Sequence, residues 1–258
     1  MPSLKKTIRS GLRSFGYDLQ RVSPAHRYPV EFGAAEKKAF DHVRAHNLSM
    51  VSDERLFATI LACKHVIEQG IPGDFVECGV YKGGNAILAK MLFDAAGVER
   101  RVWLFDTFLG MTKPLPVDVD TGTGEDALRH YASMDRGDHN DWVYCPIDQV
   151  KSHFEAAGLL DDKVVFVQGD VLQTLAQPLL PEQIAVLRLD TDWYESTLKE
   201  LQVLYPRLSV GGALLIDDYG HFQGAQKATD EYFSGAVRRP LLNYTDYTGR
   251  VAVKVGTD

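Results

Sequence analysis

The spacing of apolar residues changes part-way along the chain. In the first quarter, apolar side chains recur every three or four residues, as in amphipathic helices. This spacing predicts one helix over residues 34–47 and a second that begins after Ser52 and stops at Gly70. Beyond that point the apolar residues gather in short continuous runs separated by helical stretches. These runs are Phe75–Cys78, Val102–Asp106, Val164–Val167, Ile184–Asp190 and Ala213–Asp217.

Continuous apolar runs of this length are typical of parallel strands that are buried on both faces. Helical patterns lie between them, over Ala86–Gly97, Gln149–Gly158, Glu195–Leu204 and Gln223–Phe233. Repeated strand–helix units predict an α/β fold with a doubly wound, mostly parallel sheet, which is the Rossmann-like class. A last pair of segments, Pro240–Tyr244 and Arg250–Val255, is expected to close the sheet as a hairpin.

The chain is expected to divide into an N-terminal extension, residues 1–49, and a main domain, residues 50–258. Within the main domain, residues 107–145 form a long acidic connection with little periodicity. Loops of this length in compact domains usually serve as lids or specificity loops. We therefore expect residues 107–145 to cover the site and to become ordered when ligands bind.

The first 27 residues form a basic arm, with six Lys or Arg and one Asp. Leu4, Ile8, Leu12 and Phe15 recur at helical spacing within it and predict a short amphipathic helix. Two interpretations stand. The arm either contacts a membrane surface peripherally or packs on its own domain or on a sister subunit of a homo-oligomer.

Composition narrows the class of protein. The 258 residues carry a net charge of −7, so the chain is a poor candidate for nucleic-acid binding. Its three cysteines lie far apart, which argues against a disulfide framework or a cysteine-rich zinc site. There is no apolar run of about 18 residues and no secretory signal pattern. These features predict a cytoplasmic enzyme.

A glycine-rich turn follows the first apolar run. It reads Glu77-Cys78-Gly79-Val80-Tyr81-Lys82-Gly83-Gly84-Asn85, so the spacing is E-x-G-x-x-x-G-G rather than the G-x-G-x-x-G of dinucleotide-binding proteins. A carboxylate at this turn repels a pyrophosphate but suits an amine-bearing ligand, such as the methionine part of S-adenosylmethionine. The alternative is a tight structural turn with no ligand.

Two further turns extend the predicted donor site. Asp106 ends the second run, where an acid can accept hydrogen bonds from ribose hydroxyls, and Thr107 and Phe108 follow it. Gly169 and Asp170 follow the third run and are expected to contact adenine. The flanking residues Tyr81 and Asn85 of the glycine turn belong to the same predicted site.

Acidic residues end two neighbouring strands of the predicted sheet. Asp190 and Asp192 follow one run, and Asp217 and Asp218 follow the next. Three or four carboxylates at one edge repel each other unless a cation joins them, and oxygen-only ligands favour Mg²⁺, Mn²⁺ or Ca²⁺ over zinc. Helix capping by Asp192 and Asp218 is the alternative. His221 follows the same edge and is a candidate general base or substrate hydrogen-bonding residue.

The motifs resemble the TylF/MycF-type macrocin O-methyltransferase family over about four-fifths of the chain, from Met50 to Arg250. The strings that carry the resemblance are Pro72–Val80, Lys82–Gly84, Leu187–Thr197, Leu204–Leu208 and Asp217–Gly220. The resemblance implies a class I methyltransferase fold, S-adenosylmethionine as donor, Mg²⁺, and a sugar hydroxyl as acceptor. His221–Gly224 departs from the macrolide enzymes, so a macrolide sugar is not assumed.

The resemblance also implies roles for individual residues. It puts metal-binding aspartates at Asp190, Asp217 and Asp218, with Asp190 also at the position of the base. It puts donor contacts at Glu77, Gly79, Asp106 and Asp170.

The sequence therefore predicts an O-methyltransferase that uses S-adenosylmethionine and Mg²⁺ or Mn²⁺ on a sugar hydroxyl of a natural-product glycoside, a nucleotide sugar or a surface glycan. The cation would lower the pKa of the hydroxyl, and Asp190 or His221 would take the proton. Two alternatives remain: a nicotinamide (NAD) oxidoreductase, although the dinucleotide fingerprint is missing, and a non-catalytic binding module on the same scaffold.

Overall fold

The computed structural model describes residues 8, 11–14, 27–235 and 237–256. Its contacts divide the chain into two compact units, Met1–Gly33 and Ala34–Asp258. The boundary predicted from the sequence falls after residue 49. The division by contacts falls before residue 34, because helix α2 (Ala34–Ala45) packs against helix α4 (Gly84–Ala95) of the main unit. The apolar stripe expected in the basic arm falls largely outside the described residues.

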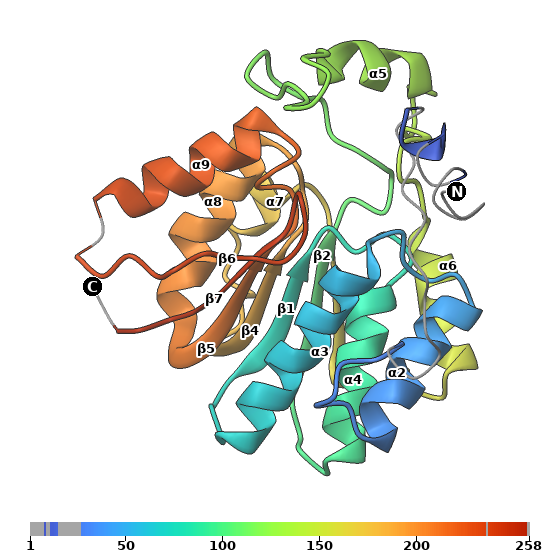
Figure 1. Ribbon diagram of the computed structural model, residues 1–258, viewed down its shortest axis with the longest axis vertical. Helices are drawn as coiled ribbons and strands as arrows, with labels where there is room; N and C mark the ends of the chain where they lie inside the picture. The colour runs from blue at the N-terminus through green and yellow to red at the C-terminus, as the bar shows by residue number, and fades with distance from the viewer. Residues whose placement is uncertain (1–7, 9–10, 15–26, 236, 257–258) are drawn as a thin grey trace, which may run out of the picture. The chain divides into compact units, whose positions relative to one another are not determined.

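A seven-stranded sheet forms the centre of the main unit, in the order β3-β2-β1-β4-β5-β7-β6 (Figure 1). Strands β1 to β5 are parallel, and β7 and β6 add an antiparallel hairpin at one edge. The predicted fold class and the closing hairpin are both confirmed. The strands are β1 (Asp74–Cys78), β2 (Val102–Asp106), β3 (Val164–Gln168), β4 (Ile184–Leu189), β5 (Leu208–Ile216), β6 (Asn243–Tyr244) and β7 (Arg250–Val253).

Helices cover both faces of this sheet. Helices α2, α3 (Asp53–Glu68) and α4 lie on one face, and α7 (Val171–Thr174), α8 (Tyr194–Leu204) and α9 (Gln223–Ser234) lie on the other (Figure 1). Helix α6 (Ile147–Ala156) packs near the start of α4, and a 3₁₀ turn, Tyr205–Arg207, follows α8. Within the described residues, no helix combines the length and apolar character needed to cross a membrane.

Local sequence explains where several elements begin and end. The Ser52 side chain accepts a hydrogen bond from the Arg55 amide and so caps α3 as predicted. Strand β5 begins five residues earlier than expected, at Leu208. Gly212 permits this start, because a Cβ there would come within 2.8 Å of the Ala185 carbonyl on β4. Gly212 thus allows an irregular pairing between β4 and β5. The apolar pattern of the sequence does not predict this irregularity.

Residues 107–145 contain more structure than their pattern indicated. Helix α5 (Ala127–Met134) lies within them, capped by the Asp126 side chain. Trp142 packs edge-on against Trp193 and near Phe222, with ring centroids 5.5 and 6.5 Å apart. This small aromatic core joins the insertion to the start of α8 and the start of α9. The sequence pattern missed it because its partners come from three separate segments.

Candidate active site

A cavity opens at the carboxyl ends of β1, β2, β4 and β5, where ligands bind in open α/β sheets. This cavity is lined by most of the residues that the sequence predicts to bind the methyl donor, to bind a metal or to take the proton. They are Gly79, Tyr81, Gly84, Asn85, Asp106, Thr107, Gly169, Asp170, Asp190, Asp217, Asp218 and His221. Glu77, Gly83 and Phe108 do not line it. Phe108 is buried against Phe166, and Gly83 packs on α6.

The glycine turn brings two strand ends into contact. Gly79 has a φ of +81°, and a Cβ on it would lie 1.9 Å from the Asp190 carbonyl oxygen. Only glycine permits this approach of β1 to the end of β4. Tyr81, in the same turn, has a φ of +50°, a strained value for a non-glycine residue. Such strain gathers at functional sites, and here it shapes the floor of the cavity.

Asp106 fastens this turn. Its carboxylate accepts hydrogen bonds from the amides of Val80 and Tyr81, at 2.6 and 3.2 Å, and from the Phe108 amide at 2.6 Å. Burial raises the pKa of Asp106, although these amides act in the opposite direction. Asp106 therefore has a structural role, since it holds the turn at the floor of the cavity, and its contact with a ribose stays a prediction.

Glu77 lies beneath the cavity, fully buried, with Oε1 3.1 Å from Arg188. Burial raises the pKa of Glu77 to about 8. Arg188 is also buried and donates to Asp190 at 2.5 Å and to Asp217. Burial alone would lower the pKa of Arg188, but its three carboxylate partners raise it. Glu77 thus pairs with Arg188 under the cavity, and its predicted contact with the donor stays a prediction.

Asp217 is held by two guanidinium groups. Arg55 of α3 and Arg188 of β4 each donate to one of its oxygens. Arg55 also pairs with Asp246, at 3.1 Å, in the turn between β6 and β7. Both arginines were missed in the sequence. The signal was present for Arg188, because a charged residue inside a fully buried strand requires a buried partner.

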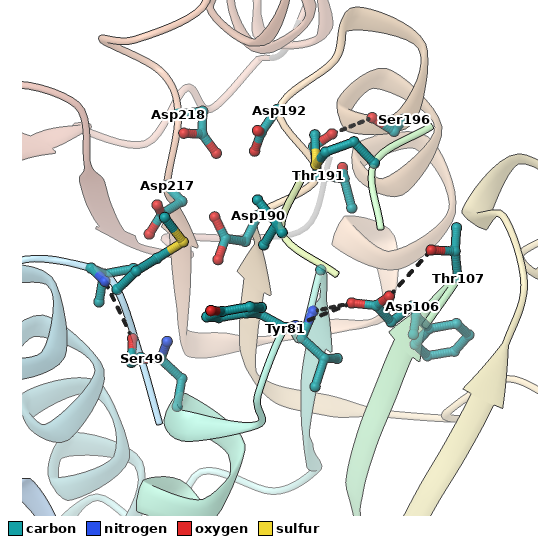
Figure 2. A pocket seen from close by; sticks show the side chains of 18 of the residues that line it. Ser49, Tyr81, Asp106, Thr107, Asp190, Thr191, Asp192, Ser196, Asp217 and Asp218 are labelled. Atoms are coloured by element: carbon teal, nitrogen blue, oxygen red, sulfur yellow. Dashed lines mark hydrogen bonds between the residues drawn. The ribbon is translucent and has the colours of Figure 1, made fainter. Parts of the chain in front are cut away.

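The carboxylates of Asp190, Asp192 and Asp218 form the group that could hold a metal ion. One oxygen from each lies within 4.8 Å of the others. Figure 2 shows Asp192 and Asp218 facing each other above the Asp190–Asp217 pair. The sequence named Asp217 rather than Asp192 as the third ligand. The oxygens of Asp217 accept from Arg55 and Arg188, and its role as a ligand stays a prediction.

The donor set fits a divalent cation. Among the described residues, Oδ2 of Asp218 is buried and has no hydrogen-bond partner. Nearby, four carboxyl groups, those of Glu77, Asp190, Asp217 and Asp246, share the two guanidiniums of Arg55 and Arg188. Burial raises the pKa of Asp192 to about 8 and that of Asp217 to about 7. A cation would coordinate the unpartnered oxygen and neutralise part of the negative charge. Ligands that are all oxygen atoms suit Mg²⁺ or Mn²⁺.

His221 lies at the rim between two segments far apart in sequence. Its Nε2 is 3.5 Å from the Asp120 carboxylate of the insertion, and its Nδ1 is 3.3 Å from the Tyr247 hydroxyl. Asp120 also accepts hydrogen bonds from the amides of Gly122 and Thr123, and these lower its pKa. The insertion thus contacts the candidate base, His221, through the side chain of Asp120.

Comparison with known proteins identifies the family. Residues 12–250 match the model of the macrocin O-methyltransferase (TylF) family. The chain belongs to this family. The match confirms the resemblance seen in the motifs and, with it, the methyltransferase class.

Three characterised relatives align with this TylF-family chain. The tetracenomycin 4′-O-methyltransferase of Streptomyces olivaceus, which acts on a dimethoxy-rhamnosyl compound, is 40% identical over 66% of the chain and 62% of its own length. The demethyldecarbamoylnovobiocin O-methyltransferase of Streptomyces niveus is 35% identical over 81% of the chain and 78% of its length. The mycinamicin III 3″-O-methyltransferase of Micromonospora griseorubida is 35% identical over 71% and 69%.

Solved structures agree with the family fold. The O-methyltransferase NovP superposes with a TM-score of 0.69 at 32% identity, covering 81% of this chain and 83% of that one. The calicheamicin methyltransferase CalS11 superposes with a TM-score of 0.57 at 18% identity, over 92% and 99% of the two chains, and shows the fold alone.

Two further walls of the cavity in this family member were not foreseen. The connection between α2 and α3 supplies Leu48, Ser49, Met50 and Val51, and the turn before β7 supplies Tyr247 and Thr248. Neither segment carries a sequence pattern typical of a binding site. Both reach the cavity only because α3 and the antiparallel hairpin flank the same strand ends.

Proposed function

We propose that this chain transfers the methyl group of S-adenosylmethionine to a sugar hydroxyl, with a divalent cation held by the aspartate cluster. One observation carries the proposal: the carboxylate group and the glycine turn open into the same cavity. The printed names of two relatives, a rhamnosyl-tetracenomycin 4′-O-methyltransferase and a mycinamicin 3″-O-methyltransferase, support a sugar-bearing natural product as acceptor.

The donor would lie along the glycine turn. Gly79 and Tyr81 form its floor, and Gly169 and Asp170 lie on the β3 side, where the adenine is expected. Asp170 caps α7 through the Leu172 amide, which fixes that turn. Asp190 places a carboxyl group beside this floor, which suits a sulfonium or an ammonium better than a pyrophosphate. This feature argues against the oxidoreductase alternative.

Asp190, Asp192 and Asp218 would hold the cation, with Asp217 behind them on its two arginines. When bound, a divalent cation acts as a Lewis acid that lowers the pKa of a nearby hydroxyl. The chain's own residues then orient the acceptor so that its oxygen meets the methyl group at about 3 Å in line, which supplies much of the catalysis.

Two residues of the chain are candidates to take the proton. Asp190 lines the cavity, and burial raises its pKa, although the Arg188 guanidinium, 2.5 Å from Oδ2, acts in the opposite direction. His221 has partners on both ring nitrogens, Asp120 and Tyr247, and lies at the rim where an acceptor enters. A pH–rate profile of Asp190→Asn against His221→Asn distinguishes them.

Ligand-induced shifts in melting temperature test the donor. S-adenosylmethionine should raise the melting temperature and NAD should not, because only a ligand that binds the folded state stabilises it. A shift with NAD alone would favour the oxidoreductase instead. Methyl transfer from labelled S-adenosylmethionine is then measured with rhamnosides and nucleotide sugars as acceptors. Chelation should abolish turnover and Mg²⁺ should restore it. Full turnover in chelated protein free of metal by elemental analysis would remove the cation from the proposal.

A further inference from the structure

We propose that the ring of Tyr247 is a stacking platform for the acceptor sugar, which assigns a substrate-binding role to the turn between β6 and β7. The inference rests on the proposed function, since it supposes a sugar acceptor. Tyr247 lines the cavity that holds the aspartates, yet the residue is 62% exposed. An aromatic ring that lines a cavity without being buried offers an open apolar surface.

The backbone that carries this ring is held in place by contacts with the strand end of Asp217 and Asp218. The Gly220 amide donates to the Thr248 carbonyl at 2.9 Å, and the Thr248 hydroxyl donates to the Asp217 carbonyl at 2.7 Å. The contact is so close that a Cβ on Gly220 would lie 1.9 Å from the Tyr247 carbonyl oxygen. The position of Tyr247 is therefore fixed relative to the carboxylates.

A second set of contacts holds the other side of the turn. Asp246 accepts from the Ser52 hydroxyl at 2.6 Å and pairs with Arg55 at 3.1 Å, so the turn is fastened to the start of α3. It also accepts from the Gly249 amide at 2.7 Å. A ring on a backbone braced from two sides loses little conformational entropy when a ligand binds, which is why tyrosine is effective at recognition surfaces.

The surroundings of the Tyr247 ring suit a pyranose, which has both an apolar face and polar hydroxyls. The His221 ring meets Tyr247 edge-on, with centroids 5.9 Å apart and planes at 82°, and Nδ1 lies 3.3 Å from the hydroxyl. The contact with Nδ1 is made by the hydroxyl, at the tip of the Tyr247 ring. A pyranose has an apolar C–H face and an edge of hydroxyls, so it can stack on the ring while its hydroxyls reach the aspartates.

The test compares variants of Tyr247 with a matched control on the same hairpin. Tyr247→Ala removes the platform, and Tyr247→Phe keeps the ring but removes the hydroxyl that contacts His221. Tyr244→Ala is the control, because Tyr244 is 69% exposed but lies outside the cavity, against Arg250. Saturation-transfer NMR and titration with methyl α-L-rhamnopyranoside and methyl β-D-glucopyranoside measure sugar binding directly, without turnover.

We expect Tyr247→Ala to weaken sugar binding by about 2- to 12-fold, the range for one aromatic contact, with S-adenosylmethionine binding unchanged. Tyr247→Phe and Tyr244→Ala should bind sugar as the wild type does. Saturation transfer to the C–H protons of one pyranose face, lost in Tyr247→Ala, would support stacking. No sugar binding by the wild type, or equal binding by Tyr247→Ala with an unchanged melting temperature, would overturn it. If Tyr247→Ala melts early, Tyr247→Leu, which keeps apolar area without a ring, replaces it.

The result separates this inference from the proposed function. Sugar binding that depends on Tyr247, without methyl transfer to any acceptor, would support the platform and overturn the activity. Methyl transfer with an unchanged KM for the acceptor in Tyr247→Ala would support the activity and overturn the platform.

Discussion

The four aspartates at the strand ends have different neighbours, and these neighbours assign them different roles. Asp217 is bound by two arginines, whereas Oδ2 of Asp218 is buried and has no hydrogen-bond partner in the part of the chain that the structure describes. An aspartate held by guanidiniums stabilises the metal-free fold. One that faces other carboxylates destabilises it until a cation arrives.

This contrast predicts opposite effects of two similar substitutions. Without metal, Asp217→Asn should lower the free energy of unfolding by about 1.5–3 kcal/mol, because hydrogen bonds to charged groups are lost. Asp218→Asn should leave it unchanged or raise it, because carboxylate repulsion is reduced. Urea unfolding in chelator measures both. Equal losses in the two variants would contradict the assignment.

With metal, Asp218→Asn should weaken Mg²⁺ binding in calorimetry and lower turnover about 10²–10³-fold, the loss typical of one strong electrostatic contact. Affinity for S-adenosylmethionine should be nearly unchanged, because the donor floor at Gly79 and Tyr81 is not altered.

At the scale of elements, a buried carboxylate is one of the contacts that hold the insertion of residues 107–145 against helix α8. Asp118 accepts from the Leu115 amide at 2.7 Å and from the Tyr194 amide, the first of α8, at 2.8 Å. Trp193, the residue before α8, offers no side-chain cap, so Asp118 caps the helix from another segment. Its Oδ1 also lies where a Cβ of Gly224 on α9 would be.

Asp118→Ala should therefore lower the free energy of unfolding by about 1–2 kcal/mol and speed hydrogen exchange across residues 107–145. The control is Asp126→Ala, which removes the cap of α5 at an exposed site and should speed exchange only within α5. If Asp118→Ala left exchange in the insertion unchanged, the aromatic contact of Trp142 with Trp193 would be sufficient to hold it.

At the scale of the whole molecule, buried carboxyls make stability depend on pH. Glu200 on α8 is fully buried, and its Oε1 accepts from the Thr191 hydroxyl at 2.8 Å. Burial raises the pKa of Glu200 to about 8, against about 4.3 in an unfolded chain. Between these values the folded state binds more protons than the unfolded state, so the Glu200 contribution to stability falls as pH rises.

Glu200→Gln, which keeps an acceptor for Thr191 but cannot ionise, should therefore become more stable than the wild type as pH rises from 5 to 9. Urea midpoints across this range measure the difference. Glu195→Gln makes the same charge change at an exposed position of α8 and corrects for net charge. A gap that narrowed toward high pH would contradict the raised pKa.

The periodicity of the sequence determined the sheet, the helices around it and the edge where the site lies. Continuous apolar runs can only be buried on both faces, and residues that follow parallel strands meet at one edge. Asp190, Asp217, Asp218 and the glycine turn could therefore be placed together from sequence.

Only the tertiary structure decided what each of these groups contacts. Arg55 and Asp217 lie 162 residues apart, and no local pattern pairs them. The contact between Asp120 and His221 and the hydrogen bond from Ser52 to the turn that carries Tyr247 also join residues that are distant in sequence. Local sequence fixes backbone conformation through propensity and burial. Which carboxylate meets an arginine and which is left for a cation depends on distances that exist only after distant segments have packed.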